Sequence, residues 1–260
     1  VSPRDQGSPD PRPEPPPGAP EADPWTDPAL AAALLAVDPE GLGGALLRAR
    51  PGPARDAWMD AFRPLLPEGT PLRRLPASIG DDRLLGGLDL AATLSAGRPV
   101  WSPGVLAEAH GGVVILPMAE RATAGLASRL GTALDSGEAR AERDGRSIAA
   151  PARFALVALD EGAEPDERAP EALADRLAFR LDLTAIPRAA IGEPAATPED
   201  VAEARARLPE VTAPPELAEA LAKAAAALGI ASLRAPLLAL RAAGAAAALL
   251  GAEEAGEIEG

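Results

Sequence analysis

The sequence predicts an α/β fold with a buried parallel sheet, followed by a small domain made only of helices. Residues 113–116 and 154–159 are two continuous apolar runs that lack the alternation of a half-exposed strand. Such runs are typical of parallel strands that helices cover on both faces. From Thr197 onward Ala, Leu and Arg dominate, and the pattern is helical without a strand-like run.

Composition narrows the class of protein. Of the 260 residues, 47% are apolar but only 2% are aromatic, so the core has to be built mainly from Ala, Leu and Val. The formal net charge is −14 without a dense basic run, which excludes a typical nucleic-acid-binding protein. The sequence has no cysteine and one histidine, His110, which excludes disulfides, multi-histidine metal sites and Ser-His-Asp triads.

The ends of the sequence carry no targeting signal. No apolar run approaches the roughly 20 residues that cross a bilayer, and the sequence around Val1 does not resemble a signal peptide. We therefore expect no membrane span and a cytoplasmic location. Residues 1–28 interleave proline with Asp, Glu, Ser and Gly, which predicts a disordered linker or tail in preference to a proline-rich ligand.

The first ordered elements are predicted as helix, strand, loop and helix. Pro28 begins a helical stretch with Asp27 placed to cap it. Residues 41–49 are predicted as a short strand, and residues 57–66 as a helix that Pro67 ends. A glycine-containing loop between a strand and a helix is where a phosphate-binding loop sits.

This loop departs from the phosphate-binding pattern G-x-x-x-x-G-K-[ST] at each defining position. The matching residues are Ala49, Ala54, Arg55 and Asp56. Pro51 and Pro53 also remove two backbone N–H donors. Alanine lacks the backbone freedom of glycine, and Asp56 puts a carboxylate where a hydroxyl would meet magnesium. We predict that the loop cannot cradle ATP.

The strand at 113–116 also lacks residues that a working nucleotide site needs. In nucleotide-hydrolysing α/β proteins such a strand ends in acidic residues that hold magnesium and polarise a water. Here Pro117 and Met118 follow. The following helix places Leu126, Leu130 and Leu134 on one face, and we expect Met118 and Ala122 to extend that face into the core.

Between these strands the sequence is rich in loops. We expect a helix at 91–96, a turn at 99–103 and a short helix at 105–109. Residues 140–148 contain Asp144-Gly145 between strand-like arms, which predicts a β-hairpin.

The strand at 154–159 is followed by Asp160 and Glu161. A solvated acidic loop is favoured there over a catalytic carboxylate pair. Residues 170–176 are predicted as a short helix, and residues 178–183 as an edge strand.

Three helices complete the chain, at about 198–208, 215–228 and 233–250, the first capped by Thr197 and the others closed by Gly229 and Gly251. The predicted organisation is a proline-rich segment at 1–28, an α/β core at 29–187, a linker at 188–196 and a helical domain with an acidic tail at 197–260.

Several collinear motifs within residues 29–250 carry a family resemblance. They read R-L-L-G-G-L-D-L from Arg83, G-R-P-V-W-S-P-G from Gly97, S-G-E-A-R-A-E-R-D-G-R-S from Ser136, L-A-D-R-L from Leu173 and L-G-I-A-S-L-R-A from Leu228. Together they resemble the AAA+ modules of magnesium chelatase. With its decayed motifs, the chain is most similar to the D-subunit family of the bacteriochlorophyll-making type.

The resemblance assigns roles by position. Arg55 and Asp56 stand at the lysine and hydroxyl positions of the phosphate loop, and Glu161 near a polar sensor that is normally asparagine. Arg176, in L-A-D-R-L, matches the arginine that reaches a neighbour's ATP in AAA+ rings, and Arg234 matches the sensor arginine of the helical domain. The structural alternatives are an Arg176 ion pair with Asp175 or Asp182, a solvated Arg234, an Arg55 salt bridge and a packed His110.

The resemblance implies a non-hydrolysing assembly subunit. It would form rings with copies of itself and with the ATPase I subunit, and it would couple ATP hydrolysis to magnesium insertion into protoporphyrin IX on the porphyrin-binding H subunit. ATP and Mg²⁺ are then expected at the interface with the partner rather than in the chain's own loop. The alternative is a free-standing ATPase of the wider chelatase-related AAA+ group.

Overall fold

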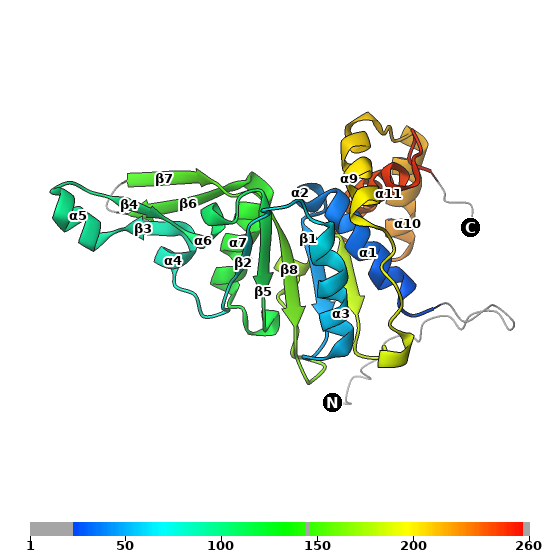
Figure 1. The fold of residues 1–260 in the computed structure, drawn as a ribbon, viewed down its shortest axis with the longest axis horizontal. Helices are drawn as coiled ribbons and strands as arrows, with labels where there is room; N and C mark the ends of the chain where they lie inside the picture. Colours follow the sequence, from blue (N-terminus) through cyan, green and yellow to red (C-terminus); the bar gives the residue numbers. More distant parts are fainter. Residues whose placement is uncertain (1–22, 144–145, 257–260) are drawn as a thin grey trace, which may run out of the picture.

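A five-stranded parallel sheet forms the centre of the computed structural model, which describes residues 23–143 and 146–256 (Figure 1). The predicted disorder of residues 1–22, the hairpin turn at 144–145 and the last four residues lie outside this range. The strand order is β2-β5-β8-β1-β9, with bounds β1 (Gly44–Arg48), β2 (Leu72–Arg74), β5 (Gly112–Leu116), β8 (Phe154–Asp160) and β9 (Phe179–Asp182). The predicted buried strands and the predicted edge strand are confirmed.

Alternation along the strands divides the core into two layers. In β8, Ala155, Val157 and Leu159 belong to the cluster that includes residues of α1 (Thr26–Val37) and α3 (Pro53–Phe62). The intervening residues belong to the cluster on the other face, with α7 (Ala124–Ser136). Every residue of β5 and β8 is buried, as expected for parallel strands with both faces covered.

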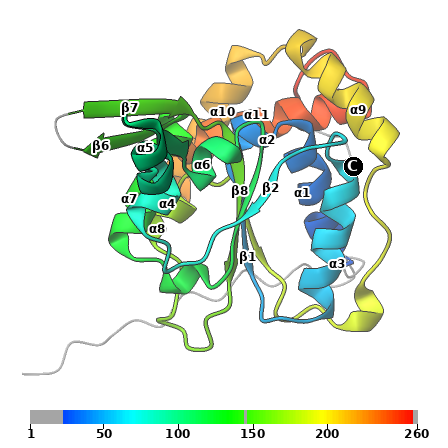
Figure 2. The same ribbon diagram turned by 60° about the vertical axis from the view of Figure 1, so that its left-hand side comes forward.

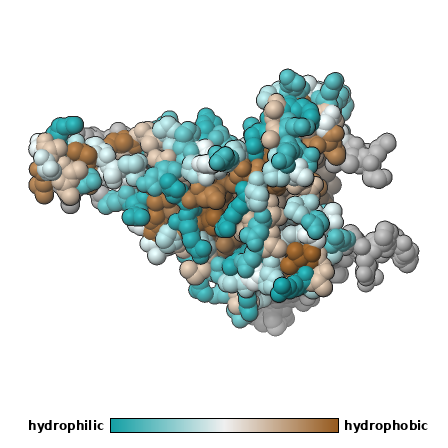
Figure 3. All heavy atoms as spheres, in the orientation of Figure 1, coloured by the Kyte–Doolittle hydropathy of each residue, from teal (hydrophilic) through white to brown (hydrophobic). Residues whose placement is uncertain are grey.

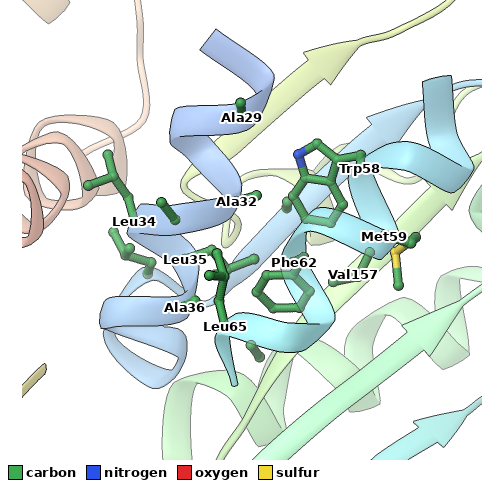
Figure 4. Close-up of a cluster of buried hydrophobic side chains, with 14 of the residues drawn as sticks. Ala29, Ala32, Leu34, Leu35, Ala36, Trp58, Met59, Phe62, Leu65 and Val157 are labelled. Atoms are coloured by element: carbon green, nitrogen blue, oxygen red, sulfur yellow. The ribbon is translucent and has the colours of Figure 1, made fainter. Parts of the chain in front are cut away.

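The few aromatic side chains are concentrated between α1 and α3. Trp58 and Phe62 stack with ring centroids 5.2 Å apart, and Figure 4 shows them beside Leu35 and Val157. The Trp58 indole donates a 2.8 Å hydrogen bond to the carbonyl of Pro28. This contact fixes α1 against the helix that follows the candidate phosphate loop.

The N-terminal elements begin earlier than predicted. Helix α1 starts at Thr26, so Asp27 lies in its first turn and does not cap it. Part of the predicted strand at 41–49 is the short helix α2 (Pro39–Leu42), because Asp38 accepts a hydrogen bond from the backbone N–H of Gly41. Helix α3 begins at Pro53 instead of residue 57, which places Arg55 in its first turn.

An arm projects from one side of the sheet (Figure 1). It contains α4 (Asp81–Leu85), β3 (Gly86–Leu88), α5 (Leu90–Ala96), β4 (Trp101–Pro103) and the hairpin of β6 (Glu138–Arg143) and β7 (Arg146–Pro151), with α6 (Val105–Glu108) at its base. The predicted turn at 99–103 is wrong, because 101–103 pair with β3 as a strand. Figure 3 shows apolar atoms at the tip of the arm, where Leu94 is exposed.

Helix α7 confirms most of its predicted apolar face. Leu126, Leu130 and Ala122 are buried, and Leu134 packs partly buried against the same cluster. The prediction for Met118 is wrong, since its side chain is 48% exposed. After Pro117 the chain turns with Met118 in a left-handed conformation (φ 50°) and enters the 3₁₀ turn η2 (Ala119–Arg121), which points the side chain outward.

The three predicted C-terminal helices are α9 (Pro198–Arg207), α10 (Pro215–Ala227) and α11 (Arg234–Leu250), and a fourth short helix, α8 (Glu171–Ala174), precedes β9. Thr197 caps α9 in a reciprocal capping box with Asp200, as the sequence predicts for Thr197. Three 3₁₀ turns, η1 (Arg63–Leu65), η3 (Arg188–Ala190) and η4 (Leu208–Glu210), connect elements. No helix in residues 23–143 or 146–256 is long and apolar enough to cross a membrane, and the cytoplasmic location stays a prediction.

The helical region lies at the end of the sheet where the strands begin (Figures 1 and 2). Val201, Ala204 and Ala245 belong to the same buried cluster as Leu34 and Leu35 of α1. The loop after β1, in contrast, lies at the opposite end, where the strands stop. The chain's own candidate nucleotide site is therefore not covered by its own helical region.

Candidate functional site

The degenerate phosphate loop has the predicted topology of strand, loop and helix. Strand β1 ends at Arg48, residues 49–52 form the loop, and α3 begins at Pro53. A cavity of about 510 Å³ lies at this end of the sheet, between the carboxyl ends of β1 and β8 and the start of α3. Ligands of open α/β sheets bind at such a position, so the side chains that line this cavity decide what it can hold.

The guanidinium group of Arg48 is engaged in contacts within the protein. Its Nη1 lies 3.1 Å from Oδ1 of Asp160, and the guanidinium also donates to the carbonyls of Gly162, Glu164 and Glu167. Asp160 is 2% exposed and accepts from the backbone N–H groups of Gly162 and Ala169 as well. The pair therefore fixes the loop after β8 across the end of the sheet, and the prediction that this carboxylate lies in a solvated loop is wrong.

Arg55 is also paired. Its Nη1 lies 3.1 Å from Oε1 of Glu161, and both side chains are mostly buried. The structural alternative for Arg55, a salt bridge, is confirmed, and the sensor-like position Glu161 is its partner. Asp56 is exposed and lies 3.6 Å from Nε of Arg55, so this position offers a carboxylate where a nucleotide site needs neutral or positive donors.

These residues do not fit magnesium-ATP. Pro51 and Pro53 supply no N–H groups to a phosphate. Pro117 follows strand β5, and the Glu120 side chain, which is 5% exposed, accepts a hydrogen bond from the backbone N–H of Glu161. Within the described part of the chain, no group of three or more His, Cys, Asp or Glu residues is arranged to hold a metal ion.

A second cluster gathers the two arginines that the sequence singled out. Arg176 follows α8, and its Nε and Nη2 lie 3.0 and 2.6 Å from Oδ2 of Asp135. Arg234 is the first residue of α11, and its Nη2 lies 3.2 Å from the same oxygen. Its Nη1 lies 3.3 Å from Oδ2 of Asp175. One carboxylate at the end of α7 thus holds both guanidinium groups.

The arginine cluster lies far from the chain's own loop, because α7, α8 and α11 place it at the end of the sheet where the strands begin (Figure 2). Exposed apolar side chains lie close to Arg234 along the chain. We define the apolar turn patch as the exposed residues of the α10–α11 turn and the first turn of α11, which are Leu228, Ile230, Leu233 and Leu237. An exposed apolar group of this kind beside charged residues is typical of an interaction surface.

The two arginines favour the ionised form of Asp135. Partial burial alone would raise the pKa of Asp135, but hydrogen bonds and charge from Arg176 and Arg234 bring this pKa below its usual value. A carboxylate with a lowered folded-state pKa stabilises the fold above its unfolded pKa, and this contribution is lost as pH falls through the folded-state pKa.

We therefore expect the difference in unfolding free energy between the protein and Asp135→Asn to stay constant from pH 6 to pH 8. It should shrink as the pH falls below about 4, the usual range of an aspartate. Urea unfolding of both proteins across this range measures the difference. A difference that already shrinks between pH 7 and pH 5 would contradict the lowered pKa of Asp135.

Some of the arrangement differs from the sequence-based expectations. Arg176 pairs with Asp135 and not with Asp175 or Asp182, and Arg234 is ion-paired instead of freely solvated. The prediction of a packed His110 is wrong, because the residue is exposed and its Nδ1 accepts a hydrogen bond from the backbone N–H of Arg153. Sequence reasoning missed Arg48 and Asp135. No local sequence signal marks Arg48, because it meets Asp160 only through the register of β1 and β8.

Comparison with known proteins places these observations in a family. The chain is 54% identical over 218 residues to the magnesium-chelatase 60 kDa subunit of Cereibacter sphaeroides, across 84% of this chain and 36% of that subunit. It is 31% identical to the magnesium-chelatase 38 kDa subunit of Rhodobacter capsulatus, across 87% of this chain and 79% of that subunit. No protein-family model matches the chain.

A solved structure shows the fold. A candidate ATPase from Cytophaga hutchinsonii superposes with a TM-score of 0.61 at 16% identity, covering 88% of this chain and 80% of that one. The likeness, together with the parallel sheet and the C-terminal helices, confirms the predicted α/β fold with a helical C-terminal region. The chain spans little more than a third of the length of the 60 kDa relative.

Proposed function

Since this chain belongs to the magnesium-chelatase family of AAA+ proteins, we propose that it is a non-hydrolysing module that acts on the ATP of a neighbouring subunit. The main support for the proposal is that the chain's own loop and the two arginines lie at opposite ends of the same sheet. The chain's own loop is closed by ion pairs, while Arg176 and Arg234 lie together at the opposite end of the sheet.

The state of the chain's own site supports the loss of hydrolysis. A working site needs backbone donors, a lysine and oxygen ligands for magnesium around the β- and γ-phosphates. Here prolines replace donors, Arg48 is held by Asp160, and Arg55 is held by Glu161. The groups that would meet phosphate are satisfied within the protein, so a nucleotide would have to break these pairs to bind.

Arg176 supports the action on a neighbour. An arginine supplied in trans stabilises the charge that develops on the transferred phosphoryl group, and it is worth on the order of 10³–10⁵ in hydrolysis rate. Asp135 and the carbonyl of Ala172 engage Nε, Nη1 and Nη2 of Arg176. A guanidinium group carries five N–H bonds, so each Nη atom keeps one N–H for an incoming phosphate.

The surroundings of the arginines support an intersubunit interface. The apolar turn patch lies beside Arg234, and a groove of about 770 Å³ runs next to it between Asp175 and Leu238. A contact that joins this end of one subunit to the loop end of the next is heterologous, and repeated contacts of this kind close into a ring. We propose that the chain forms such rings with copies of itself and with the ATP-hydrolysing 38 kDa type of subunit.

In the assembled enzyme, the hydrolysis that Arg176 supports would drive insertion of magnesium into protoporphyrin IX on a third, porphyrin-binding subunit, in bacteriochlorophyll synthesis. Magnesium is here a substrate, and this chain would touch neither the metal nor the porphyrin. Its contribution is to position an arginine at the partner's ATP and to transmit the resulting movement through the ring.

ATP turnover by the isolated chain tests the proposal against the alternative, a free-standing ATPase. We expect magnesium-dependent phosphate release at the level of the buffer blank, because the chain's own site offers neither the donors nor the metal ligands. A labelled ATP analogue titrated against the chain, alone and with the 38 kDa subunit, should show saturable binding that depends on the partner. Steady hydrolysis by the chain alone would establish the alternative.

A further inference from the structure

We propose that Asp135 is a positioning residue that, with the side-chain-free Gly131 one helical turn earlier, holds Arg176 and Arg234 as an aligned pair for the neighbour's phosphate. The inference rests on the proposed function of Arg176 and adds the part of the molecule that orients it. We refer to Gly131 and Asp135 together as the arginine cradle.

The contacts of Asp135 are those of an orienting group. Both of its oxygens lie 3.0 Å from Nε of Arg176, and Oδ2 also lies 2.6 Å from Nη2. The side-on approach fixes the plane of the guanidinium group, which a contact through a single nitrogen would not do. Arg176 is 80% buried, since its side chain keeps only 20% of its exposure, so it is held far more closely than a typical surface arginine.

Gly131 provides the space in which the guanidinium lies. A Cβ atom at this position would be 3.0 Å from Nε and 3.1 Å from Cζ of Arg176, closer than side chains normally pack. Glycine inside a helix is unfavourable relative to alanine, so its presence in the middle of α7 needs a packing reason. Residues 131 and 135 share one face of the helix, which places the space and the carboxylate side by side.

The cluster is more than one surface ion pair, because Arg234 contacts the same carboxylate as Arg176. Arg234 reaches Asp135 from α11, 99 residues along the chain, and Asp175 holds its other nitrogen. Two guanidinium groups at one place repel each other unless a carboxylate lies between them. Exposed ion pairs contribute little to stability, so the main consequence of this arrangement is the fixed orientation of two long side chains at the surface.

Asp135→Asn tests the cradle in the complex with the ATP-hydrolysing subunit. The variant keeps the volume but loses the charge, so Arg176 becomes free to rotate away. Because misplacement by about 1 Å can cost on the order of 10²-fold in rate, we expect kcat of the partner's ATP hydrolysis to fall ten- to hundredfold. KM for ATP and the assembled mass should stay unchanged, a split that a general loss of stability would not produce.

A second variant changes the space beside Arg176 and leaves the charge of Asp135 unchanged. Gly131→Ala pushes a methyl group against Arg176 and should lower kcat in the same way. Gly125→Ala is the matched control, because the same substitution in the same helix meets the far end of the exposed Arg129 side chain and, at an ordinary contact distance of 3.8 Å, the hydroxyl of Thr123. Asp81→Asn, which breaks the exposed Asp81–Arg129 pair to α7, is the control for charge. Both controls should leave kcat within about twofold.

The outcomes separate this inference from the proposed function. If Arg176→Ala lowers the partner's hydrolysis while Asp135→Asn and Gly131→Ala do not, the cradle is overturned and the proposed function stands. If Arg176→Ala has no effect, the proposed function itself fails. If Asp135→Asn prevents folding, Gly131→Ala alone decides the matter, because the three atoms nearest to the added methyl group all belong to Arg176.

Discussion

Arg176→Ala is expected to abolish most of the stimulation that this chain gives to the ATP hydrolysis of its partner subunit. The guanidinium group is proposed to meet the γ-phosphate of the neighbour, where an arginine supplied in trans is worth on the order of 10³–10⁵ in rate. At interfaces formed by this chain, hydrolysis should therefore fall by about 10³-fold. Phosphate release by the mixed complex, at saturating ATP, measures the effect.

Assembly should survive the substitution, because the apolar turn patch remains. Sedimentation of the mixed complex checks this point. Arg129→Ala is a suitable control, since Arg129 also forms an ion pair with an exposed carboxylate but lies outside the cluster. Arg176→Lys keeps the charge without the planar fork and should recover little of the rate. Hydrolysis that is unchanged in Arg176→Ala would remove the arginine from the mechanism.

Asp160→Asn is expected to cause the largest loss of stability among single substitutions at the candidate sites. The carboxylate is 2% exposed, and it pairs with Arg48, whose side chain is 13% exposed. Removing one partner leaves the other charge buried without compensation, which costs about 3–5 kcal/mol. The loss also releases the loop after β8, because Arg48 holds three of its carbonyls.

Urea unfolding at pH 7 measures this loss. Glu171→Gln is the matched control, because it neutralises an acid in an exposed pair with Arg180. Such a pair contributes about 0–1 kcal/mol, so the control should unfold almost as the unchanged protein does. A loss below about 1 kcal/mol for Asp160→Asn would show that the pair does not support the loop.

The central strands could be predicted because the residues of each strand show the pattern within a short stretch of sequence. Residues 113–116 and 154–159 are apolar throughout, and only strands covered on both faces tolerate that pattern. Thr197 with Asp200 and the glycines at 229 and 251 mark helix ends through their own short-range chemistry. Met118 could not be placed in the same way, since its exposure follows from the left-handed turn after Pro117 and not from its hydrophobicity.

The two clusters were predictable only in part, because their partners are distant in sequence. The failed phosphate loop could be recognised from Ala49, Pro51 and Pro53, since each residue removes a property that the loop needs. That Asp160 would pair with Arg48 depends on how β1 and β8 align, 112 residues apart. Asp135 is 41 residues from Arg176 and 99 residues from Arg234 in the chain, and its role becomes visible only when α8 and α11 meet the end of α7.

A cryo-EM structure of the mixed complex with a non-hydrolysable ATP analogue tests the central claim most directly. The account predicts nucleotide in the partner's site, with the guanidinium of this chain's Arg176 within hydrogen-bond distance, about 3 Å, of the γ-phosphate. Asp135 should still contact the opposite edge of that guanidinium group. Magnesium and nucleotide seated in this chain's own loop, between Arg55 and Pro117, with Arg176 facing solvent, would contradict the account.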